Sequence, residues 1–294
     1  MQCRCLLLAL AVSSFLPLSG CSGPDLVNAF VPDEGYRLVA DLPYGQGPRQ
    51  RYDLYIPEGA RGETPTIVFL YGGGWDSGAK EDYLFAGEAF ASRGYVTAIP
   101  DYRLYPEVRY PAFLEDSAAA VSSVLRNLGT EEVSAGPLYL VGHSAGAYNV
   151  VMLSLDGRWL AAQGLDPCGA VAATAGLAGP YDFLPLRSDR LKAIFGAEES
   201  RGRTQPIEYA RADAPPLLLV AGRDDTTVDP ENSARLAARV EAAGGRAETL
   251  FYEDIGHVAL VGALASSLRD LAPVLEDVDA FLSRHPKPLC GGAG

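Results

Sequence analysis

Short apolar segments, each ended by glycine or proline, recur along most of the chain. Three of them are rich in β-branched or aromatic residues: "RYDLYIP" from Arg51, "TIVFLYG" from Thr66 and "YVTAIPDY" from Tyr95. This composition is typical of buried strands. Between the last two lies "LFAGEAFASRG", whose apolar spacing predicts a helix that stops at Gly94.

The alternation continues to the end of the chain. "YPAFLEDSAAAVSSVLRNLG" predicts a helix that starts near Pro111, "PLYLVGHS" a strand, "AGAYNVVMLSL" a helix and "GAVAATAGLAG" a strand. "PPLLLVAGRDD" and "RAETLFYEDIGH" predict strands on either side of the helix "ENSARLAARVEAAGG", and a last helix is expected at about 273–284. Strands that alternate with helices of this length predict an α/β fold, with a doubly wound, mainly parallel sheet covered by helices on both faces.

The first twenty residues differ from the rest. "MQCRCLLLALAVSSFLPLSGC" has one positive charge, an apolar run and small residues before Cys21. The run is about a dozen residues, too short for a membrane-spanning helix, so residues 1–20 are predicted to be a secretory signal peptide. The tetrapeptide LSGC at 18–21 resembles the bacterial lipobox. That resemblance implies lipid on Cys21, which would anchor the chain to a membrane of the bacterial cell envelope, facing the periplasm or the exterior; an ordinary secretion signal is the alternative.

The rest of the chain divides by composition. Residues 21–48 are rich in Gly, Pro and Asp and predict a tether followed by an edge strand. Residues 49–285 carry the α/β domain, and 286–294 form a flexible tail. Residues 181–213 are charged and irregular, which fits either a small cap over the ligand-binding edge of the sheet or an ordinary surface loop.

Composition narrows the possible partners. The chain has 294 residues, 48% of them hydrophobic, enough for one sizeable domain, and a net charge of −13 with no basic run, so we expect no nucleic-acid partner. The cysteines show no zinc-binding spacing, and we expect no metal or other cofactor. In an exported protein Cys168 and Cys290 either pair or remain two unrelated thiols. The oligomeric state is left open.

"GHSAG" places Ser144 between Gly142 and Gly146, where a predicted strand gives way to a predicted helix. A serine on so sharp a turn needs small neighbours, and its hydroxyl is exposed at the start of the helix. The backbone of this turn points His143 away from the hydroxyl. Ser144 is therefore the candidate nucleophile, and its base is expected elsewhere.

"FLYGGGWDSG" follows the strand that begins at Thr66 and resembles the H-G-G-G-W segment of lipases and esterases. The resemblance implies that the amides of Gly73, Gly74 and Ala145 form an oxyanion hole. Tyr71 stands where the motif has histidine. In the family that residue supports the loop and transfers no proton, so we still expect the oxyanion hole.

Of the three histidines, one precedes Ser144 and His285 lies at the boundary of the tail, in "RHPKP". This leaves His257, just after the last predicted strand, as the candidate base. In α/β-hydrolases the acid lies between serine and histidine in the chain. Asp224, Asp225 and Asp229 are available there. The spacing of "GRDDTTV" resembles the G-x-x-D-x-x-V pattern around the triad acid and favours Asp225, with Asp224 as the runner-up.

Taken together, these motifs resemble the α/β-hydrolase superfamily, in particular bacterial carboxylesterases and feruloyl-esterase-like hydrolases, over roughly residues 51–284. Kynurenine formamidase-like and isoprenylcysteine methylesterase-like proteins are similar too. The resemblance implies a serine carboxylesterase that hydrolyses short-chain or aryl esters through a Ser144–His257–Asp225 triad and an acyl-enzyme, without a cofactor.

Other activities remain open on the same triad: arylformamide or amide hydrolysis, peptidase action and acyl transfer. A catalytically silent binding module is the alternative from another class, and the intact motifs argue against it. A lipase acting on aggregated lipid is disfavoured because residues 181–213 are mostly charged or polar and supply no long apolar lid.

Overall fold

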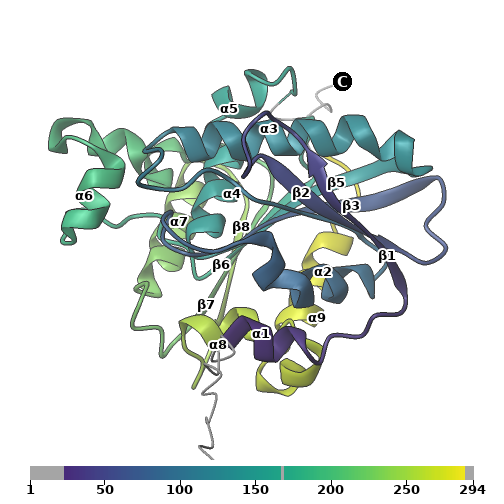
Figure 1. The fold of residues 1–294 in the computed structure, drawn as a ribbon. Helices are drawn as coiled ribbons and strands as arrows, with labels where there is room; N and C mark the ends of the chain where they lie inside the picture. The colour runs from purple at the N-terminus through teal and green to yellow at the C-terminus, as the bar shows by residue number, and fades with distance from the viewer. Residues whose placement is uncertain (1–22, 167–168, 289–294) are drawn as a thin grey trace, which may run out of the picture.

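A central sheet organises the molecule (Figure 1). The computed structural model describes residues 23–166 and 169–288. Its strands are β1 (Tyr36–Pro43), β2 (Arg51–Pro57), β3 (Glu63–Leu70), β4 (Val96–Pro100), β5 (Ser134–His143), β6 (Ala173–Leu177), β7 (Leu217–Gly222) and β8 (Ala247–Tyr252). They lie in the order β1-β2-β4-β3-β5-β6-β7-β8.

Six of the strands run parallel. The pairs β3–β4, β3–β5, β5–β6, β6–β7 and β7–β8 are parallel, whereas β1–β2 and β2–β4 are antiparallel. All residues of β4, β6 and β7 are buried, as expected of strands covered on both faces. The sheet places the carboxyl ends of β3, β5 and β7 at one edge, where loops from distant parts of the sequence meet.

Helices cover both faces of the sheet. They are α1 (Gly23–Asn28), α2 (Leu84–Ala91), α3 (Ala112–Asn127), α4 (Ala145–Leu155), α5 (Arg158–Ala161), α6 (Asp189–Phe195), α7 (Glu231–Ala242), α8 (His257–Gly262) and α9 (Val274–Ser283). Shorter 3₁₀ helices are η1 (Lys80–Tyr83), η2 (Leu128–Glu131), η3 (Glu198–Thr204), η4 (Pro206–Tyr209) and η5 (Ser266–Leu271). In Figure 1, α3, α4 and α7 lie on one face, and α2 and α9 on the other.

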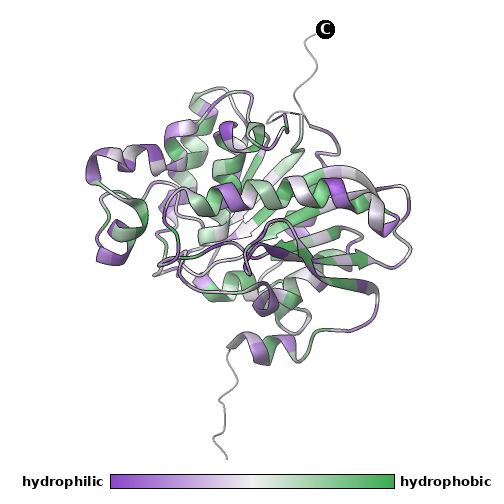
Figure 2. Cartoon of the chain, turned by 45° about the horizontal axis from the view of Figure 1, so that its top comes forward, coloured by the Kyte–Doolittle hydropathy of each residue, from purple (hydrophilic) through white to green (hydrophobic). Residues whose placement is uncertain are grey.

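The prediction of a doubly wound α/β fold is confirmed. Figure 2 shows why the sequence pattern succeeds: the strands are mostly hydrophobic, while hydrophilic residues gather on loops and on outward helix faces. The α3 helix has one apolar face, which buries Phe113, Leu114 and Val121. Such a stripe is the arrangement that packs a helix on a sheet.

Several short helices are not revealed by the sequence pattern. The short α1 lies within residues 21–48, expected as a tether and strand, and α8 begins at His257 itself. Residues 181–213, inserted between β6 and β7, hold α6, η3 and η4 and no strand. Each helix is short, and its position depends on tertiary contacts more than on propensity.

Within residues 23–166 and 169–288, no helix has the length and hydropathy needed to cross a bilayer. In the same ranges no group of three or more His, Cys, Asp or Glu side chains is arranged to hold a metal ion. The predicted signal peptide, Cys21, Cys168 and Cys290 all lie outside the residues that the structure describes.

Candidate active site

The turn between β5 and α4 presents Ser144 at the carboxyl edge of the sheet. Ser144 has φ 54° and ψ −119°, a strained backbone conformation for a residue with a side chain. An added Cβ on Gly142 would lie 2.5 Å from the carbonyl carbon of Gly146, and one on Gly146 would lie 1.9 Å from the oxygen of Leu70 on β3. The two glycines are therefore required for strand and helix to pack this closely around the serine.

Ser144, Asp225 and His257 come together from the segments that follow β5, β7 and β8. Nε2 of His257 lies 2.9 Å from Oγ of Ser144, and Nδ1 lies 2.7 Å from Oδ2 of Asp225. Asp225 follows β7, and His257 follows β8. Residues 113 and 32 positions apart in sequence thus form one continuous hydrogen-bonded chain.

The charge on Asp225 sets the tautomer of His257. Burial disfavours ionisation of Asp225, but hydrogen bonds from His257 and from the amides of Val228 and Thr227 outweigh it, and the pKa of the carboxyl is lowered. An ionised carboxylate only accepts, so Nδ1–H of His257 donates to it and Nε2 is left to accept from the Ser144 hydroxyl. This is the arrangement in which an imidazole can remove a proton from serine.

The neighbouring aspartates are not part of this chain. The side chain of Asp225 is 1% exposed, and its Oδ1 accepts from the amides of Thr227 and Val228 at 2.8 and 2.9 Å. Asp224 is exposed, and Asp229 pairs with Arg235 at 3.4 Å. Among the three aspartates, the contact to His257 is made by Asp225.

The three-glycine loop after β3 lies against the serine turn. Gly73 has φ +125°, and an added Cβ would meet the carbonyl oxygen of Ser77 at 2.1 Å, so glycine is required there. Gly74 also has positive φ and lines the same cavity as Ser144 and Ala145. In the part of the chain that the structure describes, no backbone carbonyl accepts from the amides of Gly73, Gly74 or Ala145. These amides are available to a ligand.

A network centred on Tyr71 holds this loop. The Tyr71 hydroxyl donates to Oδ1 of Asp101 at 2.5 Å and accepts from Arg49 at 2.7 Å, and the Tyr102 hydroxyl donates to the Tyr71 carbonyl at 2.8 Å. Arg49 also donates to the carbonyl of Gly78, at the far end of the loop. Tyr71, which stands where the motif has histidine, thus supports the loop through its own hydrogen bonds. Sequence reasoning missed Arg49, which has no local motif.

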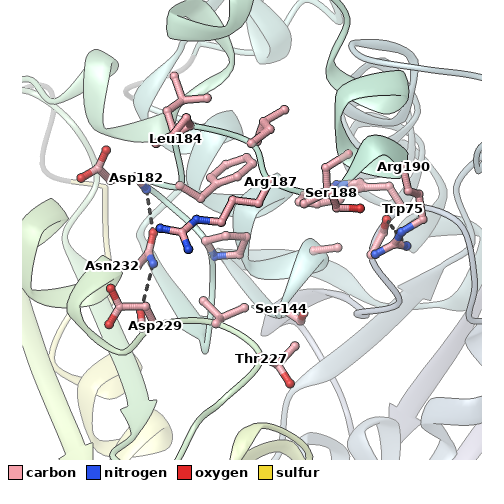
Figure 3. Close-up of a pocket in the computed structure, with 18 of the residues that line it drawn as sticks. Trp75, Ser144, Asp182, Leu184, Arg187, Ser188, Arg190, Thr227, Asp229 and Asn232 are labelled. Atoms are coloured by element: carbon pink, nitrogen blue, oxygen red, sulfur yellow. Dashed lines mark hydrogen bonds between the residues drawn. The ribbon is translucent and has the colours of Figure 1, made fainter.

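A cavity of about 440 Å³ opens beside Ser144 (Figure 3). Its walls come from the glycine loop, from residues 180–191 and from the loop after β7. Trp75 lines it while packing edge-on against Phe195, with ring centroids 4.8 Å apart, and its indole N–H donates to Asn149 at 3.1 Å. Residues 182–191, the first part of the segment 181–213, therefore form much of the wall that faces the serine.

His143, the residue before the serine, contacts the base and not the hydroxyl. Its Nε2 lies 3.1 Å from the carbonyl oxygen of His257, and because a carbonyl only accepts, Nε2 carries the proton. Its Nδ1 is buried, with no partner among the described residues. Burial, with a smaller effect from His257, lowers the pKa of His143 to about 3, so its ring is neutral at ordinary pH.

The lowered pKa of His143 predicts that the stability of the protein depends on pH. In the unfolded chain the pKa of His143 is about 6.5. Between pH 6.5 and pH 3 the unfolded state therefore binds a proton on this ring, whereas the folded state does not. The contribution of His143 to the free energy of unfolding is therefore constant above pH 6.5. It decreases as the pH falls, by about 2 kcal/mol between pH 7 and pH 5. Urea unfolding at both pH values should show this loss in the wild type and a smaller one in His143→Gln, whose amide can still donate to His257.

His285→Gln is the matched control, since it also removes one histidine but from the end of the described chain. It should keep the wild-type pH dependence. Equal loss of stability in the wild type and His143→Gln would contradict the prediction.

The fold and the site define an α/β-hydrolase with the side-chain arrangement of a serine hydrolase. The family model of BD-FAE matches residues 52–240, more than half of the chain. The chain therefore belongs to the BD-FAE family.

Individual relatives are more distant. A probable isoprenylcysteine α-carbonyl methylesterase of Arabidopsis thaliana is 28% identical over 283 residues, covering 85% of this chain and 58% of its own length. Kynurenine formamidase of Salmo salar is 28% identical over 193 residues, covering 65% of this chain and 62% of its own length. The chain thus spans less than two thirds of these relatives.

The structural comparison agrees on the fold. Esterase B from Lactobacillus rhamnosis superposes with a TM-score of 0.74 and 20% identity, covering 89% of this chain and 92% of that one. The two sequence relatives are named as a methylesterase and a formamidase, and the structural neighbour as an esterase.

Proposed function

We propose that the protein hydrolyses short-chain or aryl carboxylic esters through an acyl-enzyme on Ser144. The observation that carries the proposal is the pair of contacts of His257, 2.9 Å to the Ser144 hydroxyl and 2.7 Å to Asp225. A nucleophile, a base and a group that orients the base are then in the geometry that acyl transfer requires.

In the first half-reaction His257 Nε2 takes the proton of Ser144 as Oγ bonds to the ester carbonyl carbon. The amides of Gly73, Gly74 and Ala145 bind the oxyanion of the tetrahedral intermediate, and each well-placed donor contributes about 3 kcal/mol to transition-state stabilisation. Asp225 stabilises the imidazolium. The intermediate collapses, and the departing alcohol takes the proton from His257.

In the second half-reaction a water molecule replaces the alcohol. His257 removes one of its protons as the oxygen attacks the acyl carbon, and the same amides bind the second oxyanion. When this intermediate collapses, the Ser144 oxygen leaves and recovers its proton from His257. The carboxylic acid departs, and the enzyme returns to its starting state.

The cavity supports small substrates. At about 440 Å³ it lies at the lower end of the usual range for ligand sites. Its apolar wall includes Trp75, Phe183 and Leu191, a surface that suits an aryl or short alkyl group. These features favour compact esters over long-chain triglycerides.

The test is hydrolysis of a p-nitrophenyl ester series, acetate through palmitate, by a chain that starts at Ser22. We expect kcat/KM to peak at acetate to butyrate. A fluorescent serine-directed phosphonate should label the protein once, on the peptide that contains Ser144.

Other results would redirect the proposal. Labelling without hydrolysis of any ester would favour the amide or formamide reaction, which would then be tested on N-formyl aryl amines. Absence of both labelling and hydrolysis would overturn the enzymatic proposal in favour of a binding module.

We further propose that Cys21 is acylated and that the enzyme is anchored to a membrane of the bacterial cell envelope. The signal-like residues 1–20 and the lipobox resemblance support this. Leu26 and Phe30, on and just after α1, are 61% and 65% exposed, so apolar side chains lie near the proposed anchor. Such side chains suit a position close to a lipid surface.

Expression of the full chain with radiolabelled palmitate tests the anchor. The wild type should take up label and sediment with membranes, whereas Cys21→Ser should be unlabelled and leave the membrane fraction. Unchanged labelling in the variant would exclude Cys21 as the acylated residue.

A further inference from the structure

Three arginines line the cavity beside Ser144, and two of them are neutralised by carboxylates. Arg190 forms an ion pair with Asp76 at 2.5 Å and donates to the Gly74 carbonyl at 3.3 Å. Arg235 pairs with Asp182 at 2.7 Å and with Asp229 at 3.4 Å. These two side chains hold the walls of the cavity together.

Arg187 is different. Within residues 23–166 and 169–288 its guanidinium has no hydrogen-bond or ion-pair partner, and the residue is exposed. Figure 3 shows its side chain extending across the cavity above Ser144, towards the side formed by Asn232. The preceding residue, Leu186, is only 5% exposed and so anchors this part of the wall. An unneutralised cation therefore faces the space where substrate would lie.

This position is unusual for the molecule as a whole. The chain as a whole carries a net charge of −13, which disfavours the approach of anions. The carboxylates that line the cavity, Asp182 and Asp229, are both engaged by Arg235. Arg187 is thus the cavity's one unpaired cation in the described part of the chain, and an arginine there offers a planar pair of donors that matches a carboxylate.

We propose that Arg187 binds a carboxylate on the substrate, so that the enzyme prefers esters that carry a second, anionic carboxylate group. The inference rests on the proposed esterase function and adds a substrate class to it. The apolar wall contacts the body of the ester, and Arg187 pairs with the charged end. This contact is a matter of binding and selection; Arg187 takes no part in proton transfer.

Matched pairs of esters test the preference. In 4-acetoxybenzoate and 4-acetoxybenzamide the charge lies on the alcohol side. In the mono-4-nitrophenyl ester of adipic acid and its terminal carboxamide it lies on the acyl side. Within each pair the shapes are nearly equal and one charge differs. After correction for each ester's rate with hydroxide, we expect the carboxylate member of at least one pair to have a kcat/KM about 5- to 20-fold higher.

Variants locate the effect. Arg187→Gln should remove the preference by lowering kcat/KM for the carboxylate ester alone, mainly through KM, and Arg187→Lys should retain part of it. Lys192→Gln is the matched control: Lys192 lies on α6, pairs with Asp189 at 2.8 Å and does not line the cavity. It removes the same charge from the same segment and should leave the preference unchanged.

The outcomes separate this inference from the proposed function. Hydrolysis of the neutral esters with no preference in either pair would overturn the role of Arg187 and leave the esterase proposal standing. A preference that survives Arg187→Gln, or that Lys192→Gln reduces equally, would also overturn it. Failure to hydrolyse any of the four esters, charged or neutral, would count against the esterase function itself.

Discussion

Replacing Ser144 with alanine should lower kcat/KM for p-nitrophenyl acetate by about 10⁵-fold or more, because it removes the atom that forms the acyl-enzyme. His257 and the glycine-loop amides remain in place, so slow hydrolysis by water alone persists at a level set by the oxyanion site. Phosphonate labelling should vanish completely. Steady-state kinetics and in-gel fluorescence measure the two effects.

The thermal midpoint of Ser144→Ala should stay within a few degrees of the wild type, or rise, since the strained backbone at 144 is retained and only one hydroxyl is lost. Ser200→Ala, at an exposed serine of η3, serves as the matched control and should keep full activity. Activity above about 1% of wild type in a pure Ser144→Ala preparation would exclude Ser144 as the nucleophile.

The second large effect, a fall in kcat, is expected when Asp225 is replaced with asparagine. In Asp225→Asn the amides of Thr227 and Val228 still have a carbonyl oxygen to bond. The side-chain amide then faces Nδ1 of His257, favouring the tautomer with the proton on Nε2. That nitrogen no longer accepts from Ser144, and kcat should fall by about 10⁴-fold with little change in KM.

Asp224→Asn is the control for this experiment. It removes the same charge one residue away, from an exposed side chain that does not contact His257. Its kcat should remain within about twofold of the wild type, in keeping with the small effect of exposed charges. The opposite ranking of the two variants would assign the triad to Asp224 and contradict the geometry.

The sequence predicted most of the framework because local pattern and tertiary position agree there. The helix expected at "AGAYNVVMLSL" is α4, Ala145–Leu155, since glycine on one side and a buried strand before it leave few alternatives. The mainly parallel sheet, covered on both faces, could also be predicted, because its strands are short runs of apolar residues without polar alternation. In such segments the spacing and type of the apolar residues are enough to predict the helix or strand that forms.

Other parts were beyond sequence reasoning. Arg49 supports the three-glycine loop through partners 22 to 52 residues away, and no motif or spacing in the sequence predicts those contacts. The path of residues 181–213 likewise depends on what they pack against. Their irregular pattern left a cap and a surface loop equally open, and the unpaired state of Arg187 emerges only when the neighbouring carboxylates are located. Long-range side-chain pairing is the information that a single sequence lacks.

The buried ring of His143 gives this enzyme an internal spectroscopic reporter. The chain has three histidines, so a sample labelled with ¹⁵N at its imidazoles yields a spectrum simple enough to assign by substitution. His143 stays in one neutral tautomer, with Nε2–H bonded to the backbone of His257 and Nδ1 unbonded. Any motion that separates the base from the serine turn breaks that bond and shifts the Nε2 resonance. Nuclear magnetic resonance can therefore follow the assembly of the catalytic loops in the resting protein, with neither substrate nor inhibitor present.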